Sequence, residues 1–525
     1  MTRIHLYDTT LRDGAQTQGV DFSAADKRAI ALALDRIGID YVEAGWPGAN
    51  PSDTAFFAAL PPLERARFAA FGMTRRPGRL ANSDEGLEAV LAPRTPVVCL
   101  VGKSWDFQVE VALGATLGQN LEMIASSIGH VVVQGREAVF DAEHFFDGYK
   151  ANPDFALSCL RAADEAGARW LVLCDTNGGT LPEEIERIVG AVARIVPGEK
   201  LGIHCHDDTG NAVANSLAAV RAGARQIQGT LNGLGERCGN ANLITLIPSL
   251  VLKLGYDVGV DVEALTQLTA LSRLLDERLN RPANPRAPYV GAHAFAHKGG
   301  LHVSAMAKDT RCYEHIDPAA VGNSRHILVS DQAGRSNILA RLAEFGLVLD
   351  GHDPRVADLV DLVKTRESQG FAYDGAAASF ELLARRQLGQ AAQEFFRVQG
   401  FRVVDERRHT EDGAVETLSE ASVELDIAGR PALVVARGNG PVDALDTALR
   451  RALEPVYPAL HGVKLTDYKV RILTPEDGTR AVTRVMIESK DPDGHRWCTV
   501  GVAANVIDAS YRALEDSLVY RLMRG

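Results

Sequence analysis

The first 250 residues alternate eight short runs of β-forming residues with helix-like segments. Such alternation is typical of a parallel α/β architecture. Eight repeats over about 250 residues predict a closed (β/α)8 TIM barrel, whose active site lies at the carboxyl ends of the strands. A doubly wound open sheet is the competing topology, but no GxGxxG motif follows the first strand. The predicted strands are 4–9, 41–46, 67–72, 96–102, 130–135, 170–176, 201–206 and 226–231.

Helix signals lie between these strands. The segment SAADKRAIALALDRIG, 23–38, predicts a helix with Ser23 as its N-cap and Gly38 near its C-terminus. The segments DFALSCLRAADEAG (154–167) and NAVANSLAAVRAG (211–223) have the same helical character. We therefore expect helices to follow the strands in order around the barrel.

The composition excludes several functional classes. The 525 residues include 56 Lys and Arg against 68 Asp and Glu, a net charge of −12 that disfavours nucleic acid as a partner. No apolar run reaches the ~18 residues of a membrane span, and the N-terminal residues lack the apolar core of a signal peptide. Seven cysteines without CxxC pairs indicate reduced thiols. We expect a cytoplasmic protein that acts on small molecules.

The segment LGIHCHDDTG, 201–210, carries the strongest local signal. His204 and His206 are two residues apart on a strand, so their rings face the same way and can bind one metal ion. The alternative is a solvated loop after a buried strand. Cys205 between them is expected to point to the opposite face as a buried filler. Asp207 and Asp208 are expected to cap the next helix rather than to orient the metal ligands.

Other polar residues also follow predicted strands. Because the carboxyl ends of barrel strands meet at one mouth, we expect these side chains to converge on a site. They are Asp8, Asp13, Glu43, Asp175, Thr176, Asn232, Glu236, Arg237 and Asn240.

The alternation of strand and helix patterns ends after residue 280. We therefore predict three domains: a barrel over 1–280, helical connector subdomains over 281–395 and a C-terminal α+β domain over 396–525. Helical patterns lie at SNILARLAEFG (336–346) and FELLARRQLGQ (380–390), and strand patterns at 395–408, 416–429 and 430–438. The segments 440–453 and 505–518 align, with Asp443 over Asp508 and Ala448 over Ala513. This internal repeat predicts a C-terminal domain built from two related halves.

Five motifs resemble one enzyme family. They are DTTLRDGAQ (8–16), EAGWPGANPSD (43–53), HCHDDTGNAVANSLAAVRAGA (204–224), NGLGERCGNANL (232–243) and FAHKGGLHVSAM (295–306). The chain resembles the 2-isopropylmalate, homocitrate and citramalate synthases, acyltransferases that condense acetyl-CoA with a 2-oxo acid. The resemblance covers nearly the whole chain, including the C-terminal domain, which resembles the family's amino-acid-sensing regulatory domain. GWPGANPSDTAFF and FDAEHFFDGYKANPDFAL most resemble the citramalate branch, which uses pyruvate.

The resemblance implies a metal site and a substrate site. Asp13, His204 and His206 would bind a divalent ion (Mg²⁺, Mn²⁺ or Zn²⁺), with Asn240 in or near its coordination sphere. Bound in this way, the ion acts as a Lewis acid on the keto group. Arg12 resembles the arginine that stabilises the developing negative charge, and Thr176 the residue that holds the substrate carboxylate.

Two residues are candidates for the catalytic base. Glu143 resembles the family's catalytic glutamate, and His302 resembles a histidine that the connector of the partner subunit supplies, with Tyr313 near it. His297 is the second choice for that histidine. Asp141 occupies a place where the family shapes the pocket for the side chain of the oxo acid, and a carboxylate there is unexpected beside a methyl group.

The resemblance also implies a homodimer, with isoleucine as the inhibitor if the product feeds isoleucine synthesis. Near alternatives are isopropylmalate or homocitrate synthesis from another 2-oxo acid. A metal-dependent aldol-type lyase shares the barrel and the HxH pair, and a third alternative is a non-catalytic amino-acid sensor.

Overall fold

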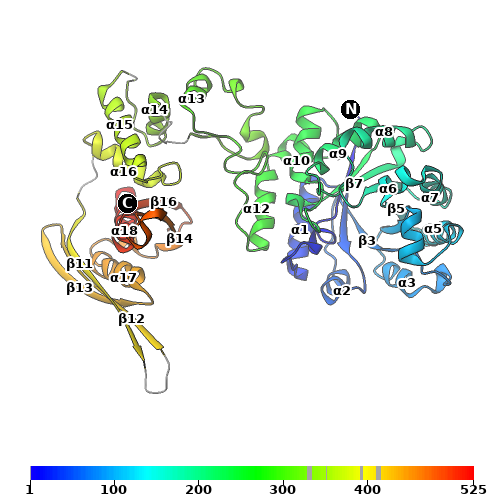
Figure 1. The fold of residues 1–525 in the computed structure, drawn as a ribbon, viewed down its shortest axis with the longest axis horizontal. Coiled ribbons are helices and arrows are strands. Elements are labelled where there is room, and N and C mark those ends of the chain that lie inside the picture. Colours follow the sequence, from blue (N-terminus) through cyan, green and yellow to red (C-terminus); the bar gives the residue numbers. More distant parts are fainter. Residues whose placement is uncertain (1, 328–333, 351, 391–393, 410–414) are drawn as a thin grey trace. The chain divides into compact units, whose positions relative to one another are not determined.

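The computed structural model describes residues 2–327, 334–350, 352–390, 394–409 and 415–525 (Figure 1). The chain forms two compact units, one of Met1–Phe295 with Ile316–Arg325 and one of Ala296–His315 with His326–Gly525. Among the described residues, no helix has the length and apolarity that crossing a membrane requires.

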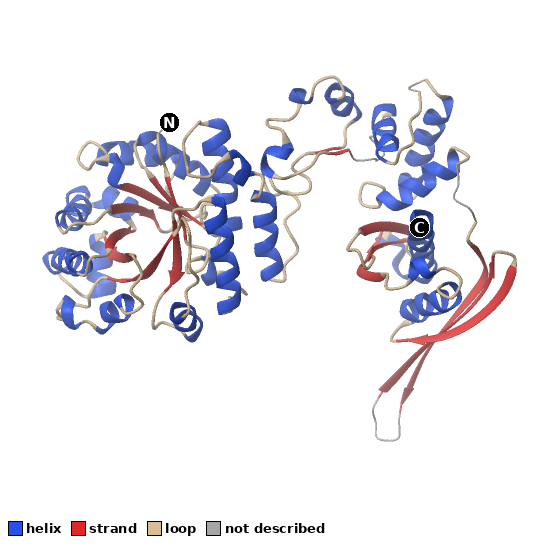
Figure 2. Cartoon of the chain, turned by 180° about the vertical axis from the view of Figure 1, so that it is seen from behind, coloured by secondary structure: helices blue, strands red, loops and turns tan. Residues whose placement is uncertain are grey.

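The first unit contains the predicted barrel. Its eight strands pair in parallel and in chain order, and β1 pairs with β8 to close the sheet. Figure 2 shows the strands inside a ring of helices. The strands are β1 (His5–Asp8), β2 (Tyr41–Gly45), β3 (Arg67–Met73), β4 (Val97–Lys103), β5 (Glu137–Glu143), β6 (Trp170–Asp175), β7 (Leu201–Cys205) and β8 (Gln226–Gly229).

The helices of the first unit confirm the predicted starts and ends. Ser23 caps α1 by accepting a hydrogen bond from the backbone nitrogen of Asp26, and Gly38 ends the helix with a φ of 98°. The helices are α1 (Ala24–Ile37), α2 (Pro51–Ala58), α3 (Glu85–Leu91), α4 (Asp106–Gln108), α5 (Leu117–Val133), α6 (Phe145–Ala151), α7 (Pro153–Glu165), α8 (Pro182–Val192), α9 (Ala212–Ala222), α10 (Leu243–Pro248), α11 (Val262–Leu265) and α12 (Leu268–Arg278).

The prediction of a strand at 130–135 is wrong. His130 to Val133 form the last turn of α5, where Val131 is buried while Val133 is 84% exposed. This helix begins at a capping box on Thr116, and its apolar face continues into the valine run. The fifth strand is β5, seven residues further along, and it contains both Asp141 and Glu143.

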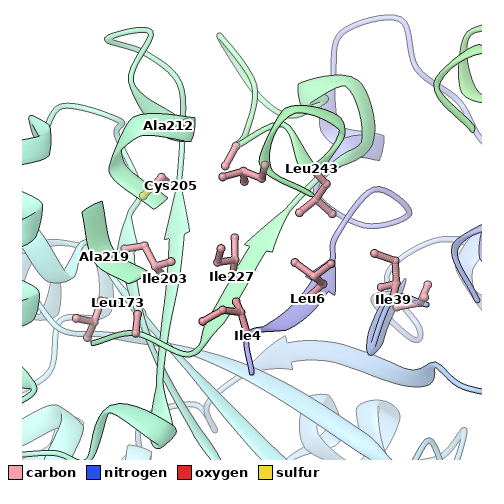
Figure 3. Close-up of a cluster of buried hydrophobic side chains, with 14 of the residues drawn as sticks. Ile4, Leu6, Ile39, Leu173, Ile203, Cys205, Ala212, Ala219, Ile227 and Leu243 are labelled. Carbon is pink, nitrogen blue, oxygen red and sulfur yellow. The ribbon is translucent and has the colours of Figure 1, made fainter. Parts of the chain in front are cut away.

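Alternation along the strands separates two apolar layers. Residues such as Tyr7, Cys99 and Val139 fill the barrel interior. Their neighbours in sequence face outward and pack against the helices, as Leu6, Leu173 and Ile203 do in Figure 3. Cys205 belongs to this outer layer, 1% exposed, and confirms its prediction as a buried filler.

In its described part, the second unit contains the short two-stranded sheet β9–β10, and its helices are followed by two three-stranded sheets. A βββα unit of β11, β12, β13 and α17 is followed by a second one of β14, β15, β16 and α18. Ala448 and Ala513 are both buried on their helices, so the internal repeat is confirmed. The elements are β9 (Ala296–His297), α13 (Gly300–Met306), β10 (His326–Ile327), α14 (Arg335–Glu344), α15 (Pro354–Ser368), α16 (Ala377–Gln387), β11 (Phe396–His409), β12 (Val415–Ile427), β13 (Arg430–Gly438), α17 (Pro441–Leu453), β14 (Lys464–Ile472), β15 (Thr483–Lys490), β16 (Arg496–Ala503) and α18 (Val506–Arg524).

Candidate metal and catalytic site

A tight turn after β1 presents Arg12 and Asp13. The carbonyl of Thr9 accepts hydrogen bonds from the backbone nitrogens of Arg12, Asp13 and Gly14, at 3.1, 2.9 and 3.1 Å. The Nζ of Lys27, on α1, donates to the carbonyl of Leu11 at 2.7 Å. The turn is therefore held from within by its own backbone and from outside by a buried lysine.

Asp13 meets the two histidines in a buried cluster. Its Oδ2 lies 3.3 Å from Nε2 of His204 and 3.8 Å from Nε2 of His206, and the two imidazole centroids are 5.2 Å apart. All three residues are buried, and one ligand atom from each lies within 4.8 Å of the others. The rings face the same way, as alternation along β7 predicts. The cluster has the donor set and spacing of a divalent-metal site.

The electrostatics of this cluster favour a bound cation. Burial raises the pKa of Asp13, but the Arg12 guanidinium and the ring of His204 outweigh burial and hold that pKa below its ordinary value. Burial, together with the neighbouring His204, lowers the pKa of His206 to about 4. The ionised Asp13 and the neutral His206 are thus in the protonation states in which such groups bind a metal, whereas Asp13 outweighs burial and raises the pKa of His204.

Asn240 offers a further oxygen. Its Nδ2 donates to the carbonyl of Leu234 at 3.1 Å, whereas its buried Oδ1 has no hydrogen-bond partner within the described part of the chain. The backbone of Asn240 forms a β-bridge with His206, which places it beside the cluster. A buried acceptor without a partner is costly unless something else binds it, so Asn240 fits the role of an additional ligand.

Arg12 is fixed by two groups. Its Nε donates to Oε2 of Glu43 at 2.6 Å, and its guanidinium carbon lies 3.9 Å from the centroid of the Phe71 ring. Glu43 is itself buried and accepts a hydrogen bond of 2.9 Å from the hydroxyl of Tyr7. Burial lowers the pKa of Arg12, but the charges of Glu43 and Asp13 outweigh that effect and raise it above its ordinary value. Arg12 is therefore a permanent cation beside the cluster.

Glu143 is paired with Lys103, a residue that the sequence analysis missed. The two residues are in register as the last residues of β5 and β4, and Nζ of Lys103 donates to Oε2 of Glu143. Alternation along β4 from Cys99, which faces the interior, would have placed Lys103 in the mouth. The pair gives this side of the mouth a carboxylate next to a cation.

Thr176 lies in the same mouth, just after β6. Its hydroxyl oxygen accepts a hydrogen bond of 2.8 Å from the backbone nitrogen of His144, so its own hydrogen is available to another acceptor. His144 has a φ of 53°, a left-handed conformation that is uncommon for residues other than glycine. Local strain of this kind is concentrated at functional sites.

Arg237 connects three loops of the mouth. Its guanidinium donates to both carboxylate oxygens of Asp208, at 2.7 and 3.0 Å, and to the carbonyl of Thr176 at 2.8 Å. Asp207 instead accepts a hydrogen bond from the backbone nitrogen of Ala212, the first residue of α9. The expectation that both aspartates cap the helix is thus confirmed for Asp207 and wrong for Asp208.

Three polar residues expected at the mouth are turned away from it. Asp8 accepts hydrogen bonds from the backbone nitrogen and the hydroxyl of Thr10, and Asp175 accepts one from the hydroxyl of Thr180. Asn232 donates to the carbonyl of Ser272. Asp8 and Asp175 follow inward-facing residues on their strands, so the pleat directs their side chains outward. They brace loops and do not line the cavity.

The remaining side chains enclose a cavity of about 310 Å³ at the carboxyl end of the barrel. The cluster of Asp13, His204 and His206, together with Arg12 and the Lys103–Glu143 pair, faces into it. The lining residues are Arg12, Asp13, Gln16, Trp46, Phe71, Met73, Val101, Lys103, Asp141, Glu143, Cys174, Thr176, His204, His206, Glu236 and Arg237.

His302 and Tyr313 belong to the second unit. Their rings are stacked, with centroids 4.0 Å apart and an interplanar angle of 22°, and both side chains are exposed. The structure therefore brings these two predicted residues together. Nε2 of His297, the second choice, lies 3.4 Å from Oε1 of Glu314 in the same unit.

Comparison with known proteins assigns most of the chain to described families. Residues 3–272 match the HMGL-like family, residues 289–370 the homocitrate synthase post-HMGL domain-like family and residues 374–522 the LeuA allosteric (dimerisation) domain.

Full-length relatives agree with this assignment. The (R)-citramalate synthase of Synechocystis sp. is 50% identical over 99% of this chain and 96% of its own length. That of Aquifex aeolicus is 49% identical over 99% and 98%. A probable 2-isopropylmalate synthase of Methanopyrus kandleri is 31% identical over 97% of both chains. The barrel, its acidic and imidazole cluster and these full-length similarities together show that the chain belongs to the (R)-citramalate synthase family.

Proposed function

We propose that this protein condenses acetyl-CoA with pyruvate to give (R)-citramalate and CoA. A bond forms between the acetyl methyl carbon and the keto carbon of pyruvate, and water then cleaves the thioester to release the CoA thiol. The observation that carries the proposal is the buried Asp13, His204 and His206 cluster beside the fixed cation Arg12. These groups recognise a small anionic substrate with adjacent oxygens.

We propose that Asp13, His204 and His206 hold a divalent ion, Mg²⁺, Mn²⁺ or Zn²⁺, with Asn240 as a further ligand. The buried, unpartnered Oδ1 of Asn240 supports that fit. When bound, such an ion withdraws electrons from the keto group of a 2-oxo acid as a Lewis acid.

Arg12 and Thr176 would bind and orient the oxo acid. Arg12 uses Nε for Glu43, which leaves its terminal N–H donors to face the negative charge that develops on the keto oxygen. The free hydroxyl hydrogen of Thr176 suits the substrate carboxylate, because its oxygen is already engaged with His144. Both side chains line the same cavity.

We propose Glu143 as the base that takes a proton from the acetyl methyl group. Glu143 and Lys103 line both the 310 Å³ cavity and a neighbouring cavity of about 190 Å³. The wall of this second cavity includes Arg75 and the exposed Arg76. A thioester placed in the second cavity would meet Glu143 at the shared wall. Removal of that proton by a positioned base is worth about 10²–10⁴-fold in rate.

His302 and Tyr313 are proposed to complete the site from the partner subunit of a homodimer. The stacked pair is exposed in the second unit, and the match to a dimerisation domain at 374–522 supports a homodimer. We also propose the division into a barrel at 1–280, a connector at 281–395 and a regulatory domain at 396–525. Isoleucine is the proposed effector of that domain, and the cytoplasm the proposed location.

The decisive assay is release of thiol from acetyl-CoA, with pyruvate, 2-oxoisovalerate and 2-oxoglutarate supplied separately, with and without Mg²⁺ or Mn²⁺. We expect metal-dependent release with pyruvate, lost in His204→Ala and kept in Cys205→Ala, because Cys205 faces the helices. Preference for another oxo acid would overturn the substrate, and release without metal would overturn the metal site. Isoleucine should lower the rate, and an unchanged rate and melting temperature would contradict it as effector.

A further inference from the structure

Asp141 is a buried carboxylate that the proposed reaction does not use. It lies on β5, two residues before Glu143 and on the same face, and it is 3% exposed. Its position suggests that it contacts the side chain of the oxo acid. In pyruvate that side chain is a methyl group, which cannot form a hydrogen bond with a carboxylate. The hydrogen bonds around it give it a different role.

A single glutamine links Asp141 to the metal cluster. Gln228 lies on β8 and is fully buried. Its Nε2 donates to Oδ1 of Asp141 at 2.9 Å, and its Oε1 lies 2.8 Å from Nδ1 of His204. Gln228 and His204 are also in register on neighbouring strands, so the backbone sets the distance between their side chains.

This chain of contacts determines which nitrogen of His204 carries hydrogen. A carboxylate only accepts hydrogen bonds, so Asp141 selects the amide orientation that turns Nε2 of Gln228 toward itself. The carbonyl oxygen of Gln228 then faces His204 and requires a hydrogen on Nδ1. In the neutral imidazole, Nε2 of His204, which lies 3.3 Å from Oδ2 of Asp13, is then left with its lone pair. A lone pair on that nitrogen is what a metal ligand needs.

We propose that Asp141 and Gln228 are positioning residues that select the Nδ1-protonated tautomer of His204 and so prepare Nε2 to bind the divalent ion. The inference rests on the proposed metal site, and it assigns a role to two residues outside the ligand set. It also accounts for a carboxylate near a methyl group, because Asp141 accepts a hydrogen bond from Gln228.

The chain offers a matched control on the same strand. Gln226 is two residues before Gln228, fully buried and on the same face of β8. Within the described residues, neither polar atom of its side chain has a hydrogen-bond partner. Gln226→Met and Gln228→Met therefore remove the same buried amide, but only the second removes a contact to His204.

The first measurement is the affinity of the full-length protein for Mn²⁺, determined from the electron paramagnetic resonance signal of the Mn²⁺ that stays free in solution. We expect Gln228→Met to weaken Mn²⁺ binding about 10–100-fold, the usual loss when the hydrogen-bond partner of a metal-binding histidine is removed. Gln226→Met should bind Mn²⁺ like the wild type. Equal affinities of the two variants would overturn the inference.

The second measurement reads the tautomer without metal. Nitrogen-15 NMR of histidine-labelled protein, at a pH where imidazoles are neutral, distinguishes Nδ1–H from Nε2–H, and His204→Gln assigns the signal. We expect the Nδ1–H form in the wild type and a mixture in Asp141→Asn, because asparagine allows either orientation of Gln228. An unchanged tautomer in Asp141→Asn, or an Nε2–H wild type, would overturn the inference. A wild type that has the expected tautomer but binds no Mn²⁺ would instead refute the proposed metal site.

Discussion

Lys27 is buried beneath the turn that carries Arg12 and Asp13, and its replacement tests how that turn is held. The side chain is 2% exposed. Its Nζ donates to the carbonyls of Leu11 and Ala44, at 2.7 and 3.1 Å, and to Oδ1 of Asp53 at 2.5 Å. All three hydrogens of the ammonium therefore have partners, which come from the β1 turn, β2 and α2.

Lys27→Met should cost about 3–5 kcal/mol of barrel stability, the usual cost of removing one partner from a buried ion pair. Among the described residues, the carboxylate of Asp53 would then stay buried with the backbone nitrogen of Trp46, at 2.8 Å, as its remaining donor. Adding Asp53→Asn to Lys27→Met removes the uncompensated charge and keeps an acceptor for Trp46. We expect this double variant to be more stable than Lys27→Met alone.

Urea unfolding followed by tryptophan fluorescence measures the loss. Trp497 is the one tryptophan outside the barrel, so a Trp497→Phe background makes the signal specific to the first unit. A loss below about 1 kcal/mol would refute the reasoning, since it is the size of an exposed pair. A double variant no more stable than Lys27→Met would refute the part played by the buried charge.

Three further predictions concern charge and metal. Burial raises the pKa of Asp8 to about 7, against an ordinary value of 3.8. The folded state therefore binds a proton that the unfolded state has lost, and the free energy of unfolding falls as pH rises from about 4 to about 7, by at most about 4 kcal/mol. In urea titrations at several pH values, Asp8→Asn should remove this pH dependence. Glu143→Gln should lower kcat about 10²–10⁴-fold in the thiol assay, and Lys103→Met should lower it less; an unchanged Glu143→Gln rate would remove Glu143 as the base. Mn²⁺ at 100 times its Kd should stabilise the wild type by about 2.7 kcal/mol in thermal unfolding, and a chelator or His206→Ala should abolish this gain.

Alternation and strand count account for most of what the sequence predicted correctly. Eight repeats predicted the closed barrel, and the spacing of His204 and His206 predicted that both rings would face one way. The same rule, applied to each strand end, would have excluded Asp8 and Asp175, which follow inward-facing residues. It would also have found Lys103, because Cys99 and Val101 on the same strand face inward.

Two features could not be predicted from local pattern. The run HVVVQG is β-branched and short, yet tertiary packing makes it the end of α5, which shows that propensity is a weak guide beside burial. Strand β14 is exposed along most of its length, so its sequence lacks the apolar alternation of a half-buried strand. Strand β15 does alternate between buried and partly exposed residues, and that signal was available.

The position of the fifth strand decides the chemistry of the mouth. With the strand at Glu137–Glu143, Glu143 is its last residue, in register with Lys103, and Asp141 faces the interior toward Gln228. A shift of one residue would turn Ala142 inward and send both carboxylates to the helix layer. The ion pair with Lys103 and the hydrogen bond to Gln228 therefore depend on one backbone register. We infer that the β4–β5 pairing positions the proposed base, Glu143, and the carboxylate proposed to select the tautomer, Asp141, together.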